Sequence, residues 1–83
     1  MERYFLLDPD QGSWFLYISN LTETQQAYIR QIFDFLDEED KEEEGRKFKF
    51  FADVPGDYYG DEFRKIINYL LAEGFESVTD CKN

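Results

Sequence analysis

YFLLDPDQGSWFLYI, residues 4–18, contains two short apolar runs separated by a segment that favours a turn. The runs, 4–7 and 14–18, are rich in aromatic residues, which favour strands. Between them Pro9 presets one φ angle and Gly12 accepts a positive one, so this segment is typical of a hairpin turn of about five residues. The sequence therefore predicts two antiparallel strands at the start of the chain.

A helix is predicted after this hairpin. Thr22 with Gln25, like Asn20 with Glu23, has the spacing of a capping box, so either pair can start the helix. Apolar residues then recur at steps of three and four, at Tyr28, Ile29, Ile32, Phe33 and Leu36. This stripe indicates one helix from about residue 21 to about residue 40.

The second half of the chain predicts a strand, a helix and a short last strand. Residues 46–54 alternate lysine with phenylalanine, which indicates a strand with its even-numbered side facing inward. A second helix is expected to begin between Asp57 and Asp61. Its apolar stripe is formed by Tyr59, Phe63, Ile66, Ile67, Leu70 and Leu71. Gly45 and Gly74 mark the ends of the two helical segments, and residues 75–81 alternate weakly, as a terminal strand would.

The expected element order is ββαβαβ. This order predicts an α+β fold, a two-layer sandwich in which both helices cover one face of a mixed three- or four-stranded sheet. The 83 residues are expected to form a single domain, 1–83. A chain of this length buries only about 60% of its unfolded surface, so one modest core is expected.

The charge balance is strongly acidic. Nineteen acidic residues against nine basic ones give a net charge of −10, beyond the magnitude of about 2 to 8 that keeps a small domain soluble. Such a charge disfavours binding to nucleic acid or to an anionic membrane. The sequence therefore predicts a basic partner protein.

The sequence offers little for catalysis, and we expect no enzymatic activity and no cofactor. The absence of histidine removes the commonest general base and the commonest zinc ligand. The segment 8–12 resembles the start of a calcium loop, but its twelfth position is Ser19 rather than glutamate. Asp10 with residues 39–41 matches an acid-acid-lysine nuclease pattern, which we interpret as chance because 39–41 are predicted at a helix end. No metal site is expected.

The location is predicted to be the cytoplasm. Cys81 is the only cysteine, so no internal disulfide forms and a reducing compartment fits. The first residues lack a signal-peptide pattern, and no segment approaches the roughly 18 apolar residues of a membrane span. We expect a monomer or a weak dimer.

The acidic residues gather in two stretches, which we predict to contact the partner. The principal contact is predicted at Asp37, Glu38, Glu39, Asp40, Glu42, Glu43 and Glu44, and a second contact at Asp53, Asp57, Tyr58 and Asp61. At the end of a helix the first stretch would oppose the helix dipole and repel itself. Residues of the second stretch near a helix start, in contrast, would be favoured there and have helix capping as their structural explanation.

These features predict a small inhibitor that blocks the DNA- or RNA-binding groove of a nuclease or other basic protein by phosphate mimicry. In size, charge and lack of catalytic groups the chain resembles small phage- or mobile-element-encoded counter-defence inhibitors, which include DNA mimics, antirestriction proteins and anti-CRISPR proteins. The targets that this resemblance implies are a nuclease, a CRISPR effector or a restriction enzyme. Two alternatives stay open: an immunity or antitoxin protein that neutralises a nuclease toxin, and an accessory subunit of a larger assembly.

Overall fold

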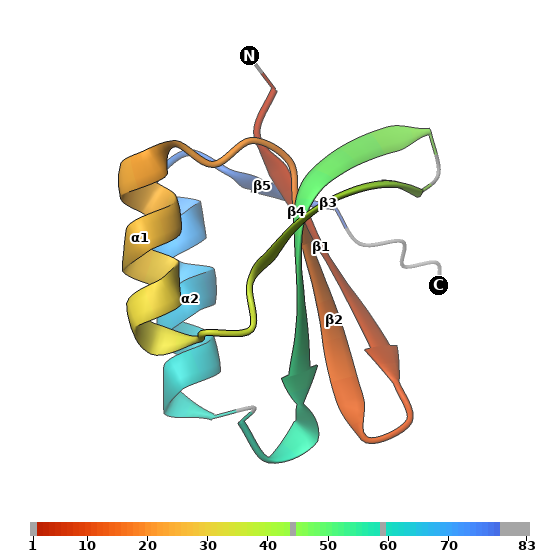
Figure 1. The fold of residues 1–83 in the computed structure, drawn as a ribbon, viewed down its shortest axis with the longest axis vertical. Coiled ribbons are helices and arrows are strands. Elements are labelled where there is room, and N and C mark those ends of the chain that lie inside the picture. The colour runs from red at the N-terminus through yellow and green to blue at the C-terminus, as the bar shows by residue number, and fades with distance from the viewer. Residues whose placement is uncertain (1, 44, 59, 79–83) are drawn as a thin grey trace.

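The chain folds into a five-stranded sheet with two helices on one face (Figure 1). The computed structural model describes residues 2–43, 45–58 and 60–78. Its elements are β1 (Tyr4–Asp10), β2 (Ser13–Ile18), α1 (Glu23–Ile32), β3 (Asp37–Glu43), β4 (Arg46–Pro55), the short 3-10 helix η1 (Gly56–Tyr58), α2 (Asp61–Ala72) and β5 (Glu76–Ser77).

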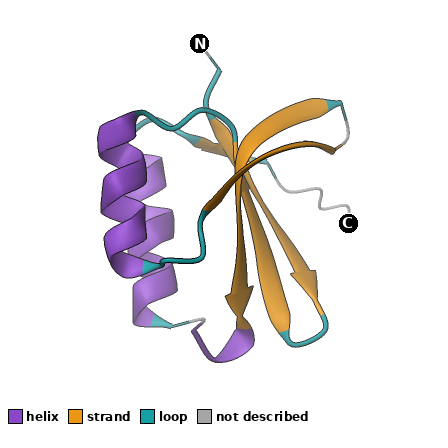
Figure 2. Cartoon of the chain, in the orientation of Figure 1, coloured by secondary structure: helices purple, strands orange, loops and turns teal. Residues whose placement is uncertain are grey.

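The sheet is mixed and has the strand order β3-β4-β2-β1-β5. All neighbouring strands are antiparallel except β5, which runs parallel to β1. The α+β class and the two helices on one face are as predicted (Figure 2). The expected order ββαβαβ with three or four strands is wrong by one element, because β3 is an additional strand and the observed order is ββαββαβ.

The first hairpin is confirmed, but its turn is shorter than predicted. The strands β1 and β2 continue to the pair Asp10–Ser13, which leaves only Gln11 and Gly12 in the turn. Gly12 has the predicted positive φ angle, 75°. Pro9 lies within β1, and a proline is compatible with a strand where its missing N–H is not required for pairing.

The helix α1 begins directly after Thr22, one of the two predicted N-caps. The hydroxyl of Thr22 accepts a hydrogen bond from the backbone N–H of Gln25, and the Gln25 side chain accepts one from Thr22 N–H. Gln25 is buried, and its amide also donates to Glu73 at the end of α2, 3.0 Å away. This capping box therefore also connects the two helices.

The predicted extension of this helix to about residue 40 is wrong. The helix ends at Ile32, and Phe33 already has an extended backbone. Phe33 and Leu36 remain fully buried although they lie outside the helix. The prediction was wrong because Phe33 and Leu36 continue the three- and four-residue spacing of the apolar stripe. The residues that follow them pair with β4 and form a strand instead.

The elements after Gly45 largely follow the prediction. In β4, Phe50, Ala52 and Val54 face the helices, as expected. The helix α2 begins at Asp61, within the predicted interval, and Gly74 follows its end with a φ angle of 94°. Leu71, expected in the apolar stripe, is 49% exposed instead, and Tyr59 lies outside the described residues, as do 79–81 of the predicted last strand.

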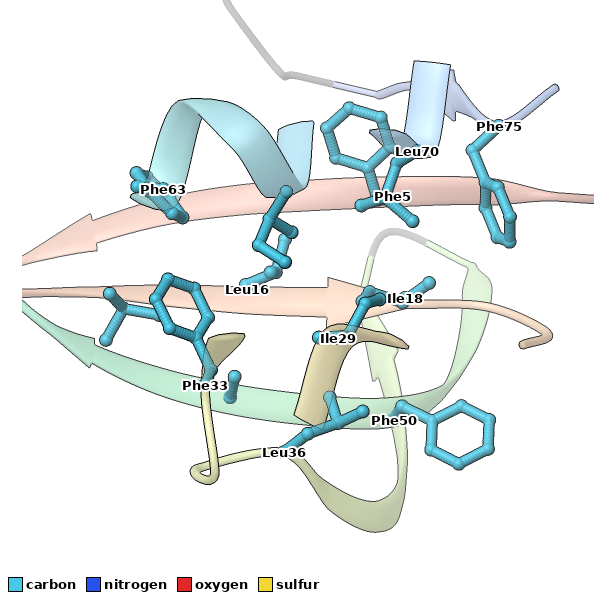
Figure 3. Close-up of a cluster of buried hydrophobic side chains, with 13 residues drawn as sticks. Phe5, Leu16, Ile18, Ile29, Phe33, Leu36, Phe50, Phe63, Leu70 and Phe75 are labelled. Atoms are coloured by element: carbon cyan, nitrogen blue, oxygen red, sulfur yellow. The ribbon is translucent and has the colours of Figure 1, made fainter. Parts of the chain in front are cut away.

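The main core lies between the sheet and the two helices (Figure 3). Strands β1, β2 and β4 contribute Phe5, Leu16, Ile18 and Phe50, and the helical layer contributes Ile29, Phe33, Phe63 and Leu70. Phe75, just before β5, closes one end of this cluster. The alternation of side chains in the strands therefore leaves the opposite, odd-numbered side of β2 directed away from the helices.

Candidate functional site

The candidate site is β3, an acidic strand at the edge of the sheet. Six of its seven residues are acidic, and the strand pairs with β4 on one side while it ends the sheet on the other. Five of the predicted contact residues are exposed on it, namely Asp37, Glu38, Glu39, Asp40 and Glu42. Glu43 is partly buried, and Glu44 lies outside the described residues.

The phenylalanines of β4 position this strand. Asp37 pairs with Phe51 and Glu38 with Phe50, and then the register shifts so that Lys41 pairs with Phe48. The shift is a β-bulge, which bends a strand and increases its twist. The free end of the β3–β4 hairpin accordingly bends toward the side of the sheet without helices (Figure 1).

Few structural contacts occupy the carboxylates of β3. Glu39 lies 3.4 Å from Lys41 and Glu38 lies 3.3 Å from Lys49, both with exposed side chains. Exposed ion pairs of this kind contribute about 0–1 kcal/mol each. Within the described ranges, no ion pair involves Asp37, Asp40 or Glu42. The strand therefore presents negative charge that folding does not require.

The helix-free face of the sheet carries a group of aromatic side chains that the sequence analysis did not identify. The rings of Tyr17 and Phe51 stack with centroids 5.3 Å apart. Phe48 is buried here, with its ring 5.2 Å from Tyr4 and 5.6 Å from Tyr17, although its even number predicted that it would face the helices. Phe15 extends the group, with its ring 5.7 Å from Phe51.

A detectable signal for this face was the continuous apolar run at residues 14–18. A strand with one solvated face alternates apolar and polar residues, whereas a run without alternation indicates apolar groups on both faces. The helix-covered side of β2 carries Trp14, Leu16 and Ile18, which belong to or pack against the main core. Phe15 and Tyr17 therefore had to lie on the other side.

Carboxylates surround this aromatic group. Burial, followed by the charges of Glu43, Asp8 and Glu39, raises the pKa of the Tyr17 hydroxyl above its ordinary value of 10.0. These three carboxylates come from β1 and β3, at the two sides of Tyr17. The helix-free face therefore combines apolar rings with neighbouring carboxylates.

The predicted second contact is divided by the structure. Asp53 is exposed on β4 and lines a shallow groove of about 560 Å³ together with Asp34 and Asp37. This groove brings Asp53 next to the start of β3. The other three residues of the predicted second contact, Asp57, Tyr58 and Asp61, lie in η1 and at the start of α2.

Asp57 lies in η1 and Asp61 in the first turn of α2. The start of α2 lies toward the other end of the sheet from the free end of the β3–β4 hairpin (Figure 1). Both aspartates are exposed, and the side chain of Tyr58 is outside what the structure describes. Asp61 is in the first turn of α2, where the helix dipole favours a negative charge. The N-cap is Gly60, with no capping hydrogen bond from a side chain in the described part of α2, so Asp57 and Asp61 do not cap this helix.

The acid-acid-lysine pattern does not form a centre. Residues 39–41 lie on a strand rather than at a helix end, so the reason given for dismissing the pattern was wrong. Asp10, however, ends β1, and both β2 and β4 lie between β1 and β3. Among the described residues, no group of three or more metal-ligating side chains is placed to hold a metal ion.

The described helices also lack the combination of length and apolar character that crossing a membrane requires.

Comparisons with protein-family models, curated proteins and solved structures find no match for this chain.

Proposed function

We propose that this protein is a small acidic inhibitor that binds a basic nucleic-acid-binding protein or nuclease and occupies its DNA- or RNA-binding groove. In this proposal the carboxylates of β3 replace nucleic-acid phosphates. The observation that carries it is the exposed, largely unpaired row of acids on an edge strand. The role is non-enzymatic and needs no cofactor.

The strand conformation supports phosphate mimicry through its spacing. A β-strand rises about 3.4 Å per residue, and each strand of B-DNA carries one phosphate per about 3.4 Å along its axis. A helix, with a rise of about 1.5 Å per residue, would concentrate the same acids over less than half that length. The six acids of β3 therefore approach the linear charge density of a nucleic-acid strand.

The position of β3 at the edge also favours this role. Successive side chains of a strand point to opposite faces, so an edge strand presents carboxylates on two sides. A groove that encloses a nucleic-acid strand supplies lysine and arginine from both of its walls. Such complementary charge accelerates association and selects a cationic partner.

Protection of the sheet edge is a separate explanation for the same charges. Charged residues and bulges on an edge strand prevent pairing with other chains, and β3 has both features. This explanation predicts self-association when the charges are removed, whereas mimicry predicts loss of a partner. Size-exclusion chromatography of a charge-neutralised variant separates the two effects.

Of the two other functions expected from the sequence, the structure offers less support for the accessory subunit. That function predicts a large exposed apolar patch, and within the described residues Leu71 is the exposed large hydrophobic side chain. An immunity or antitoxin protein would form physically the same kind of complex. Rescue of cells that express the captured nuclease as a toxin would identify that case.

Capture from a lysate of the source cells, followed by competition, tests the proposal. The immobilised protein should retain basic nucleic-acid-binding proteins, such as a nuclease, a CRISPR effector or a restriction enzyme, and added duplex DNA or RNA should release them. The proposed setting is the cytoplasm, and the protein acts as a monomer or a weak dimer. Retained proteins that do not bind nucleic acid, or that added DNA and RNA leave bound, would contradict the proposal.

A further inference from the structure

A row of three residues crosses the helix-free face outside β3. Asp8 on β1 pairs with Phe15 on β2, and Phe15 pairs with Asp53 on β4. Residues that are paired in an antiparallel sheet project to the same face, and neighbouring strands lie about 4.8 Å apart. The ring of Phe15 is therefore flanked by one carboxylate-bearing residue on each side.

This row is accessible to another molecule. Asp53 is exposed, and Phe15 and Asp8 are each partly exposed. The Phe15 ring is in contact with Phe51, which is also partly exposed. An aromatic ring between two carboxylates offers a planar apolar surface together with acceptors for hydrogen bonds.

The chain's own cations show which chemistry this face accepts. The ammonium of Lys41 lies 5.5 Å from the centroid of the Phe51 ring while it pairs with Glu39 at 3.4 Å. The guanidinium of Arg46 lies 5.9 Å from the centroid of the Tyr4 ring. In the described part of the chain, no lysine or arginine takes the equivalent position over Phe15.

We propose that Asp8, Phe15 and Asp53 form a docking site for an arginine side chain of the basic partner. This inference rests on the proposed function and assigns a second contact beside β3. A guanidinium stacks on an aromatic ring and donates parallel hydrogen bonds to carboxylates, whereas an ammonium is more strongly hydrated and does not stack. The site therefore selects arginine over lysine, while the carboxylates of β3 respond to charge alone.

Two peptides of equal length and charge, hexa-arginine and hexa-lysine, test this selection on the intact chain. The unmodified protein should bind hexa-arginine about two- to fivefold more tightly than hexa-lysine at low salt, as expected for one exposed cation–π contact. In ¹⁵N NMR spectra, hexa-arginine should shift the amide signals of Asp8, Phe15 and Asp53. Equal affinity for the two peptides would overturn the proposal.

Phe15→Leu removes the ring and keeps an apolar side chain. This variant should lose the preference for arginine and keep its affinity for hexa-lysine. Tyr28→Leu is the matched control, because the Tyr28 ring packs against Tyr69 on the other helix, with centroids 4.2 Å apart, away from the proposed site. A preference that survives in Phe15→Leu, or that disappears equally in Tyr28→Leu, would contradict the site.

Asp53→Asn is a second test of the arginine site, and it leaves the packing of the Phe15 ring unchanged. Asp53 is exposed, so the substitution should leave the fold intact and narrow the preference for hexa-arginine. An unchanged preference would remove Asp53 from the site.

The result also separates this site from the proposed function of β3. Neutralising four acids of β3 should weaken the binding of both peptides by the same factor. If that variant binds both peptides as before while Phe15→Leu loses the preference, the arginine site stands and the role of β3 fails. If the opposite holds, the role of β3 stands and the arginine site fails.

Discussion

The two faces of this sheet, built from the same strands, differ in how deeply their side chains are buried and in what packs against them. On the helix-covered face, Leu16 and Ile18 are fully buried against side chains from both helices. On the other face, Phe15 is only partly buried, and it is flanked by Asp8 and Asp53 on the neighbouring strands rather than covered by a helix. The comparison shows that the helix-covered face holds the main core, whereas among the described residues of the other face only Phe48 and Tyr17 are buried and Phe15 and Phe51 stay partly exposed.

The largest effect should come from the helix-covered face. Leu16→Ala removes a fully buried side chain, and we expect it to lower the free energy of unfolding by about 2–5 kcal/mol. Phe15→Ala, one residue earlier on β2, should cost only about 1 kcal/mol because the ring is partly exposed already. Urea denaturation of both variants gives the two values. A similar cost for both would show that the helix-free face is a second core.

The next effect concerns the capping box at the start of α1. Thr22→Ala removes the side-chain cap of α1, and we expect a loss of about 1 kcal/mol in the free energy of unfolding. Thr24→Ala changes an exposed threonine within the same helix and should be nearly neutral. Thermal denaturation followed by circular dichroism compares the two variants. Equal stability would mean that the capping box contributes nothing.

A smaller effect of opposite sign is expected at β3. The variant Glu38→Gln, Glu39→Gln, Asp40→Asn, Glu42→Gln removes four exposed charges. Since like charges repel along a strand, we expect the free energy of unfolding to stay unchanged or to rise by up to about 1 kcal/mol. Denaturation at low and high salt measures this change. A clear loss of stability would show that these carboxylates hold the strand in place.

The smallest effect is a pH dependence at Tyr17. Burial and the charges of Glu43, Asp8 and Glu39 raise the pKa of the Tyr17 hydroxyl. Above pH 10.0 the unfolded chain therefore releases this proton first, and the free energy of unfolding should fall as pH rises toward the higher pKa of the folded state. The fall should be shallower in Tyr17→Phe.

NMR titration of the Tyr17 ring carbons measures its pKa directly. A value at or below 10.0 would show that neither burial nor the neighbouring carboxylates raise the pKa of this hydroxyl.

The sequence predicted the elements whose patterns agree with their surroundings. Two apolar runs around Gly12 gave the first hairpin, and the spacing of Thr22 and Gln25 gave the start of α1. The buried residues Phe63, Ile66 and Leu70 of α2 follow the predicted stripe. In each case the local preference and the tertiary packing favour the same structure.

The prediction failed at β3 because local and long-range preferences disagree there. Glutamate and lysine favour helices, and aspartate does not favour strands, so nothing in residues 37–43 indicates a strand by itself. The pairing with β4, whose Phe48 and Phe50 are buried, supplies the stabilisation. The residue pattern of one segment does not reveal that a partner strand follows later in the sequence.

The candidate site was therefore predicted in its residues but not in its shape. Charge counting located the acidic residues of β3, of which Asp37, Glu38, Glu39, Asp40 and Glu42 are exposed. It could not place Asp53 in a groove with Asp34 and Asp37 while Asp57 and Asp61 lie elsewhere. That division depends on strand order, which the sequence did not specify.

The most direct test of the central claim is the dissociation constant of the captured basic protein for three versions of this chain. These are the unmodified protein, the four-residue β3 variant, and a control of equal net charge with Glu2→Gln, Glu23→Gln, Glu62→Gln and Glu76→Gln, all exposed and outside β3. The β3 variant should bind about tenfold more weakly and with a flatter salt dependence, while the control stays within about twofold. Equal weakening of both variants, or an unchanged affinity of the β3 variant at low salt, would contradict the claim.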